Sequence, residues 1–297
     1  MSTDSQEGAR IKIDQEQVGK AVEMFDGFWM IATRHRPGAS AKMPEINNRC
    51  LIFKLEENGA PLLLVVNGVE PAVIPEVKNL EQQTGLRVRY IVSPGGGHHL
   101  MMENWQEAFT EASVLLPPAR IPRTAHGQKL MKLERVKLLD TADPLPQFKG
   151  QLDAVLFDGL LGIRDMPSAY EGGKENMFKM MWAMMTINDP VDELWLHHVP
   201  SGAVIAGENL GWMFTKAAFE KLPGMFRMMM QAEKVYVMKG GRKVGDAARV
   251  AECWRKILSW PAKTVMTYHD TVGHAFVGDG RAALSDAVKA VKQLPAS

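Results

Sequence analysis

Histidine is the residue type with the most chemical potential in this chain, and it is unevenly distributed along the sequence. Six of the eight histidines form three groups, each just after an expected buried strand: His98 with His99, His197 with His198, and His269 with His274. Imidazole is the commonest metal ligand and the usual acid–base group near neutral pH. Because functional side chains collect at strand carboxyl ends in open α/β sheets, we expect these segments to converge on one metal-type site.

Each histidine pair also has a simpler interpretation as two hydrogen-bonded loop residues. Successive residues of an extended chain point to opposite sides, so at most one imidazole of each pair is expected to face a common centre. Three such groups in one chain nevertheless favour a shared site over coincidence. The isolated His35 and His126 lie in polar loops and receive no role.

Three carboxylates occupy comparable positions behind expected strands, namely Asp158, Glu208 and Asp270. Hard carboxylate oxygen beside imidazole nitrogen suits zinc, iron or manganese. A carboxylate at such a site can bind the metal or orient a histidine ligand. The sequence therefore predicts a centre of mixed nitrogen and oxygen ligands.

Several other function classes lack their motifs. The sequence contains no phosphate-binding GxxxxGK[ST] loop, no GxSxG nucleophile elbow and no glycine-rich dinucleotide fingerprint after its first strand. Its 35 basic residues nearly cancel 34 acidic ones, for a formal charge of +1, which gives no electrostatic case for nucleic acid or an anionic membrane. We therefore expect a small-molecule substrate and neither of those two partners.

The polar, acidic N-terminus and the two cysteines favour a cytoplasmic location. The first residues do not resemble a signal peptide, and no apolar run reaches the length of a membrane helix. Cys50 and Cys253 lie in apolar surroundings, where buried thiols are expected.

Apolar runs bounded by turn residues predict strands that alternate with helices. The expected strands are residues 48–55, 60–66, 87–92, 112–116, 132–139, 154–157, 192–196, 203–206 and 264–268. The expected helices are residues 72–84, 100–110, 175–185, 247–258 and 281–294. This alternation after an opening hairpin indicates an α/β fold with mixed sheets. Residues 1–40 are expected to form a tail and an irregular or helical lead-in, and residues 41–297 one domain.

The order of these segments resembles the metallo-β-lactamase superfamily over residues 48 to 294. The matching segments are the hairpin 48–66, the helix 71–84, the loop 94–99, the segment 197–202, the strand end at Glu208, and Tyr268-His269-Asp270. The loop lies where the family carries His-x-His-x-Asp-His. Here Pro94 and Gly96 occupy the first two histidine positions, His98 the aspartate position and His99 the last histidine position.

This resemblance implies an αββα sandwich with mixed sheets and a degenerate metal site. Two of the three usual ligands of the first metal are missing. The resemblance leaves one divalent metal, zinc before iron or manganese, held by His99, His198, Glu208 and His269. His197 is an alternative to His198. His98 and Asp270 are then acid–base or supporting groups, and Asp158 orients a ligand.

The function expected from this site is metal-assisted hydrolysis of a small, mostly apolar substrate. The chain is also similar to a subunit of heteromeric O-demethylases acting on nitroanisoles. That similarity implies hydrolysis of an activated aryl methyl ether and a homologous partner subunit. The alternative is a structural or regulatory subunit that kept the fold and lost the chemistry. Methionine-rich stretches at 177–185 and 225–230 fit either core filling or a pocket wall.

Overall fold

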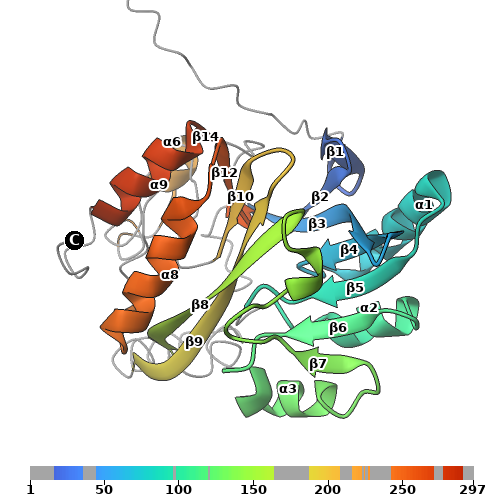
Figure 1. The fold of residues 1–297 in the computed structure, drawn as a ribbon, viewed down its shortest axis with the longest axis horizontal. Helices are drawn as coiled ribbons and strands as arrows, with labels where there is room; N and C mark the ends of the chain where they lie inside the picture. The colour runs from blue at the N-terminus through green and yellow to red at the C-terminus, as the bar shows by residue number, and fades with distance from the viewer. Residues whose placement is uncertain are drawn as a thin grey trace, which may run out of the picture.

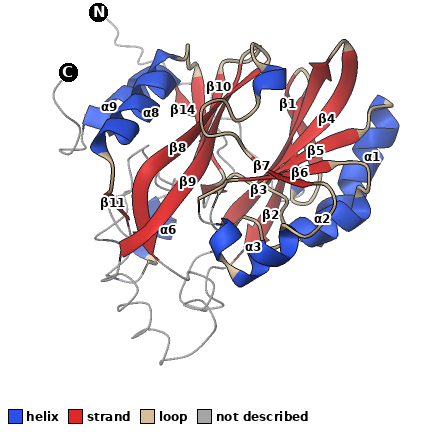
Figure 2. Cartoon of the chain, turned by 60° about the horizontal axis from the view of Figure 1, so that its bottom comes forward, coloured by secondary structure: helices blue, strands red, loops and turns tan. Residues whose placement is uncertain are grey.

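Two β-sheets packed face to face, with helices on both outer sides, form the body of the protein (Figures 1 and 2). The computed structural model describes residues 17–35, 45–95, 98–119, 121–163, 187–207, 216–222, 224, 227, 242–270 and 277–289. The predicted αββα sandwich with mixed sheets is confirmed.

The first sheet combines an antiparallel half with a parallel half. Its strands run in the order β1 (Ala21–Phe25), β2 (Phe28–His35), β3 (Ile46–Glu57), β4 (Ala60–Val66), β5 (Val88–Val92), β6 (Ser113–Leu116) and β7 (Val136–Leu138), and β13 (His269–Asp270) pairs with β3. Neighbours are antiparallel from β1 to β4 and parallel from β4 to β7. The carboxyl ends of β4 to β7 therefore share one rim of the sandwich.

The second sheet is also mixed. Its order is β11 (Arg242–Val244), β8 (Leu152–Ile163), β9 (Ile187–His198), β10 (Ala203–Ala206), β12 (Thr264–Thr267) and β14 (Val277–Gly278). β10 is parallel to β12 but antiparallel to β9. The carboxyl end of β9 consequently lies at the sheet end opposite to the carboxyl ends of β10 and β12.

Three apolar layers hold these elements together. One lies between the sheets, where Leu51 and Leu64 face Leu194 and Leu196. A second lies under α1 (Ile74–Thr84), α2 (Met102–Ala108) and α3 (Ala125–Leu130). The third lies under α8 (Ala247–Ser259) and α9 (Gly280–Lys289). The short helices α6 (Lys216–Glu220), η3 (Pro71–Val73), η4 (Ile121–Arg123) and η5 (Pro146–Phe148) complete the described elements. None of the described helices has the length and apolarity needed to cross a membrane.

The helix ends follow from local chemistry. Asp246 begins α8 because its side chain accepts a hydrogen bond from the Arg249 backbone N–H at 3.1 Å. Gly85 ends α1 in the left-handed region, at φ 69°, which glycine adopts without a steric penalty. The predicted helices 72–84 and 247–258 are thus confirmed to within a few residues.

Other expectations need correction. Residues 16–31, the part of the lead-in expected to be irregular or helical, contain β1 and the first half of β2, and β2 pairs along β3. The domain boundary that we expected near residue 40 therefore falls inside the first sheet, between β2 and β3. The strand expected at 132–139 begins only at Val136. The methionine-rich helix expected at 175–185 lies outside the described residues.

A first prediction concerns α3, which contains a glycine in its middle. A Cβ atom on Gly127 would overlap the backbone carbonyl oxygen of Ile121, so the helix can approach η4 only without a side chain there. We expect Gly127→Ala to lower the free energy of unfolding by about 1–3 kcal/mol. Urea denaturation measures this loss. Gln128→Ala on the exposed side of the same helix is the control, and an equally stable Gly127→Ala variant would contradict the packing.

Candidate functional site

At the rim formed by the carboxyl ends of β4, β5 and β12, two chain segments pass from one sheet to the other. After β5, the chain crosses to the second sheet, where the Leu194 N–H donates to the Pro94 carbonyl at 2.7 Å. The next residue, Gly95, forms an isolated antiparallel bridge with Glu193. After β12, the chain crosses the other way, and β13 pairs His269 with Asn48 of β3. These two crossings place His98 and His269 on the same rim.

His98 and His269 form a buried imidazole pair. Their Nε2 atoms are 3.3 Å apart, and their ring centroids are separated by 5.0 Å at an interplanar angle of 24°. The two residues are only 8% and 7% exposed. The pair joins segments 171 residues apart in sequence.

Hydrogen bonds at the opposite ring nitrogens define what this pair can bind. The Asn67 amide donates through Nδ2 to the Arg49 carbonyl at 2.6 Å and to Asn48 Oδ1 at 2.8 Å. Its Oδ1 is therefore the atom that faces His98 Nδ1, at 2.5 Å, and accepts the proton of that nitrogen. His269 Nδ1 faces the Asn47 carbonyl at 3.4 Å. The two Nε2 atoms face one another, and the tautomer of His269 decides whether its Nε2 donates to His98 or offers a lone pair.

When neither Nε2 carries a proton, the separation suits a cation bound between the two nitrogens. Ligand nitrogens bound at 2.0–2.1 Å to a tetrahedral zinc ion are about 3.3–3.4 Å apart, which agrees with the observed separation. Histidine ligands also usually donate their other ring N–H to a carbonyl or carboxylate, and both Nδ1 atoms face a carbonyl oxygen here. The pair therefore fits two positions of a metal centre.

A metal centre would need further ligands beside these two histidines. Within the residues that the structure describes, no three His, Cys, Asp or Glu side chains gather closely enough to hold a metal ion. Glu208 lies just outside the described residues, and its neighbour Gly207 follows β10. A Cβ on Gly207 would be 3.0 Å from Glu193 Cβ, so the chain packs closely against β9 immediately before Glu208.

His99 faces a different neighbour from His98. It is 1% exposed, and its ring centroid is 5.6 Å from that of His126 on α3. No role was expected for His126, yet α3 follows β6 and brings this histidine to the same rim. The adjacent imidazoles of His98 and His99 thus belong to two separate ring pairs.

The structure does not bring His197 or His198 to this rim, which corrects the predicted place of His198 in the ligand set. The His198 ring packs against Phe28 and Phe53, with centroids 5.4 and 5.5 Å away. Phe53 lies five residues along β3 from Asn48, the partner of His269, a displacement of about 16 Å. The physical reason is that β9 is antiparallel to β10, so their carboxyl ends do not meet.

Burial lowers the pKa of both residues in this second histidine group. The pKa of His198 falls to about 4, chiefly because the imidazole is buried and secondarily because His197 is adjacent. Its Nδ1 lies 2.8 Å from Ser201 Oγ. Burial also lowers the pKa of His197, against the opposing effect of Asp153, and its ring stacks on Trp260 at 5.5 Å. These histidines belong to the apolar layers on the two faces of the second sheet.

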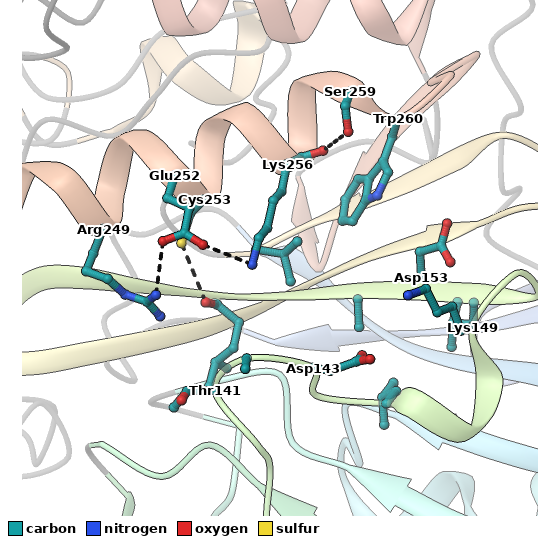
Figure 3. A pocket seen from close by; sticks show the side chains of 16 residues that line it. Thr141, Asp143, Lys149, Asp153, Arg249, Glu252, Cys253, Lys256, Ser259 and Trp260 are labelled. Carbon is teal, nitrogen blue, oxygen red and sulfur yellow. Dashed lines mark hydrogen bonds and ion pairs between the residues drawn. The ribbon is translucent and has the colours of Figure 1, made fainter.

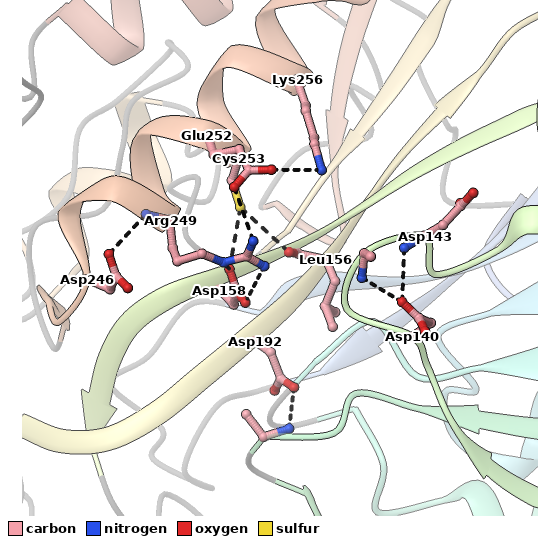
Figure 4. Close-up of polar contacts among 12 residues, drawn as sticks. Asp140, Asp143, Leu156, Asp158, Asp192, Asp246, Arg249, Glu252, Cys253 and Lys256 are labelled. Atoms are coloured by element: carbon pink, nitrogen blue, oxygen red, sulfur yellow. Dashed lines mark hydrogen bonds and ion pairs between the residues drawn. The ribbon is translucent and has the colours of Figure 1, made fainter.

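A cavity of about 510 Å³ lies away from the paired imidazoles, between α8, β8 and residues 141–149 (Figure 3). Asp158 lies near it and not at the rim, which corrects its predicted role of orienting a ligand. Its carboxylate accepts two hydrogen bonds from Arg249, at 2.8 and 3.1 Å, and lies 3.6 Å from Cys253 Sγ (Figure 4). Burial raises the pKa of Cys253 to about 11, which opposes a reactive thiolate.

Asp270 remains a prediction. Its backbone pairs with Asn47 beside the imidazole pair, but its side chain is outside the described part. Glu208 remains a prediction for the same reason.

Sequence reasoning missed several buried polar residues beside the rim. Asn67 and Arg49 are at most 1% exposed, and Arg49 donates to the Thr267 carbonyl at 2.6 Å. Asp192 and Glu193 are also buried, in the middle of β9. Asp192 accepts a hydrogen bond from the Ala119 N–H at 2.5 Å (Figure 4). The sequence signal for Arg49, Asp192 and Glu193 is a charged residue inside an apolar strand, because a buried charge needs a partner.

Comparison with known proteins shows the fold. No protein family and no curated protein matches the sequence. Among solved structures, a metallo-β-lactamase from Erythrobacter litoralis superposes with a TM-score of 0.54 at 13% identity, over 96% of each chain. One from Hirschia baltica gives 0.52 at 10% identity, over 94% of this chain and 99% of its own. A diflavin flavoprotein fragment from Nostoc gives 0.51 at 10% identity, over 91% and 95%.

Proposed function

We propose, from the premise that this chain has the metallo-β-lactamase fold, that it is a metal-assisted hydrolase whose divalent ion is held by His98 and His269. The observation that carries the proposal is the 3.3 Å separation of two Nε2 atoms whose partner nitrogens face oxygen acceptors. Zinc is the first candidate for this nitrogen pair, followed by iron and manganese. Glu208 is the proposed third ligand, and Asp270 a proposed acid–base group.

The bound ion would lower the pKa of a coordinated water to about 7 and so supply hydroxide at neutral pH. The protein's own contribution is to fix the ligands before the ion arrives. Asn67 sets the protonation of His98, and β13 sets the position of His269 by pairing with β3. His99 and His126 form the adjacent wall.

We propose a small apolar substrate, with an activated aryl methyl ether as the specific candidate. Leu100 and Met101 directly follow His99 and are 41% and 38% exposed. Apolar side chains exposed beside polar groups are typical of binding surfaces. Hydrolysis of a nitroanisole would consume one water and release methanol and a nitrophenol. A homologous partner subunit is part of this proposal.

The test is to purify the full chain, remove bound metal with a chelator, reload it with zinc, iron or manganese, and measure products from a nitroanisole and an aryl ester. We expect metal-dependent release of nitrophenol, and of methanol from the ether. Absence of both metal binding and turnover, with the chain alone and with a homologous partner, would contradict the proposal. That result would support the alternative, a structural subunit without chemistry.

A second prediction separates the role of Asn67 from its packing. Asn67→Ala removes the acceptor of His98 Nδ1, and we expect it to weaken zinc binding about 10- to 100-fold. Asn67→Asp keeps the acceptor of His98 Nδ1 but loses the two hydrogen bonds that the amide donates, so it should be less stable than wild type and still bind zinc more tightly than the alanine variant. Chelator competition measures both affinities. Equal losses in the two variants would contradict a specific role for the Asn67 oxygen.

A further inference from the structure

A buried arginine lies between the two sheets, next to the segments that carry the imidazole pair. Arg49 belongs to β3, and it alternates in phase with Leu51 and Phe53, whose side chains fill the apolar layer between the sheets. It is 0% exposed. A guanidinium is costly in such a layer unless hydrogen bonds satisfy its N–H groups. An arginine at a position that suits an apolar residue is therefore a candidate for a specific role.

Arg49 holds the segment that leads into His269 at two consecutive carbonyls. Its guanidinium donates through Nη1 to the Thr267 carbonyl at 2.6 Å, and its backbone N–H donates to the Tyr268 carbonyl at 3.1 Å. Thr267 ends β12 in the second sheet, and Tyr268 is the single residue between β12 and β13. The arginine thus fixes the place at which the chain crosses from the second sheet to the first.

The pairing of β13 with β3 by itself gives this crossing only a short contact. β13 contains two residues, His269 and Asp270. The Thr267 hydroxyl donates to the His269 carbonyl at 2.6 Å, but this bond joins two residues of the same segment. The guanidinium bond, in contrast, links Thr267 to a residue 218 positions away in the sequence. We therefore expect the position of His269 to depend on the Arg49 side chain.

The same arginine contacts the residue that orients the other imidazole. The Arg49 carbonyl accepts a hydrogen bond from Asn67 Nδ2 at 2.6 Å, and Asn67 Oδ1 faces His98 Nδ1 at 2.5 Å. One residue of β3 is therefore bonded to residues 267 and 268 on one side and to Asn67 on the other. A displacement of Arg49 would change the separation of the His98 and His269 Nε2 atoms.

We propose that Arg49 is a positioning residue, which holds His269 Nε2 at ligand distance from His98 Nε2 before a metal binds. This role rests on the proposed function, because it presupposes a metal between the two histidines. A guanidinium stays protonated and is not itself a ligand, so Arg49 acts through the carbonyls of residues 267 and 268. Ligands that are already in place bind more tightly, because less conformational freedom is lost on binding.

The test measures zinc affinity by chelator competition in three variants of the full chain. Arg49→Met keeps a long side chain and removes the donor to Thr267, and we expect it to weaken zinc binding about tenfold or more. Arg49→Lys keeps a cationic donor without the planar guanidinium, so its affinity should lie between those of wild type and Arg49→Met. Thr267→Val removes the hydroxyl bond to the His269 carbonyl and should also weaken zinc binding.

A matched control separates positioning from general stability. Ile257 of α8 is buried in the apolar layer under that helix. Ile257→Val and Ile257→Ala lower stability through this layer, and the one whose urea midpoint is nearer to that of Arg49→Met serves as the control. We expect the control to bind zinc like wild type. The second readout is the visible absorption of cobalt(II)-loaded protein, which depends on ligand geometry. Its bands should shift in Arg49→Met and not in the control.

Two outcomes would overturn the role of Arg49 and leave the proposed metal site standing, because wild type binds zinc in both. The first is an unchanged zinc affinity and cobalt spectrum in Arg49→Met. The second is an equal loss of affinity in the Ile257 control, since the effect would then come from stability alone. A wild-type protein that binds no zinc contradicts the proposed function itself, and this role with it. If Arg49→Met does not fold, Arg49→Lys and Thr267→Val decide against the same control.

Discussion

Replacement of His269 by alanine is expected to reduce bound zinc from about one equivalent to near zero and to lower hydrolytic activity at least 100-fold. His269 supplies one of the two Nε2 atoms that lie 3.3 Å apart and that we propose hold one cation. Loss of a group that merely orients a metal ligand already costs 10- to 100-fold in affinity or activity. Loss of a ligand should cost more. Elemental analysis of the purified variant and a metal-dependent activity assay measure the two effects.

The matched comparison is His198→Phe, because the resemblance placed His198 in the ligand set and the fold packs it against Phe53, about 16 Å along β3 from the residue that pairs with His269. Its ring packs between aromatic neighbours, so phenylalanine should fit. We expect this variant to retain its metal. Metal lost from His198→Phe and retained by His269→Ala would contradict the site described above. Full metal content in both variants would place the ion on other residues.

Much of the fold could be predicted from the sequence, because a strand that is buried on both faces has a long run of apolar residues. The hairpin of β3 and β4 and helix α8 follow from such patterns. The lead-in was wrong because residues 21–35 alternate poorly and include the Phe28-Trp29-Met30-Ile31 run, which fits a helix as readily as a strand. Only pairing with β3 decides between the two states, and that contact joins distant residues.

The site could be predicted only in part, because the sequence of one strand does not reveal whether that strand runs parallel or antiparallel to its neighbours. The rule that functional groups gather at strand carboxyl ends assumes neighbouring parallel strands. It holds for β5 and for β12, which deliver His98 and His269. It fails for β9, whose antiparallel pairing with β10 carries His197 and His198 to the other end. Asn67 was missed because a single asparagine after a strand is typical of any turn.

His197 and His198 lead to a prediction about the stability of the protein at acid pH. An imidazole that is buried and neutral in the folded state, with its pKa lowered from 6.5 to about 4 at His198, binds its proton more readily in the unfolded chain. Between those pH values the unfolded state therefore takes up more protons, and the free energy of unfolding decreases as the pH decreases. The full stability is present above pH 6.5, and the loss through His198 approaches about 3 kcal/mol once the pH passes below 4. The lowered pKa of His197 acts in the same direction.

His198→Phe should remove this contribution while keeping the aromatic packing against Phe28 and Phe53. The measurement is urea denaturation of wild type and variant from pH 7.5 to pH 4.5, with the difference in unfolding free energy plotted against pH. We expect the difference to shift in favour of the variant as the pH falls, because carboxylates elsewhere titrate equally in both proteins. Ser201→Ala keeps the buried imidazole and removes a hydroxyl that faces its Nδ1 and also accepts from the Ala203 N–H, so it should retain most of the wild-type pH dependence, which comes chiefly from burial. A difference that does not change with pH would show that His198 is protonated as easily in the folded protein as in the unfolded one, and that this end of the sandwich admits water.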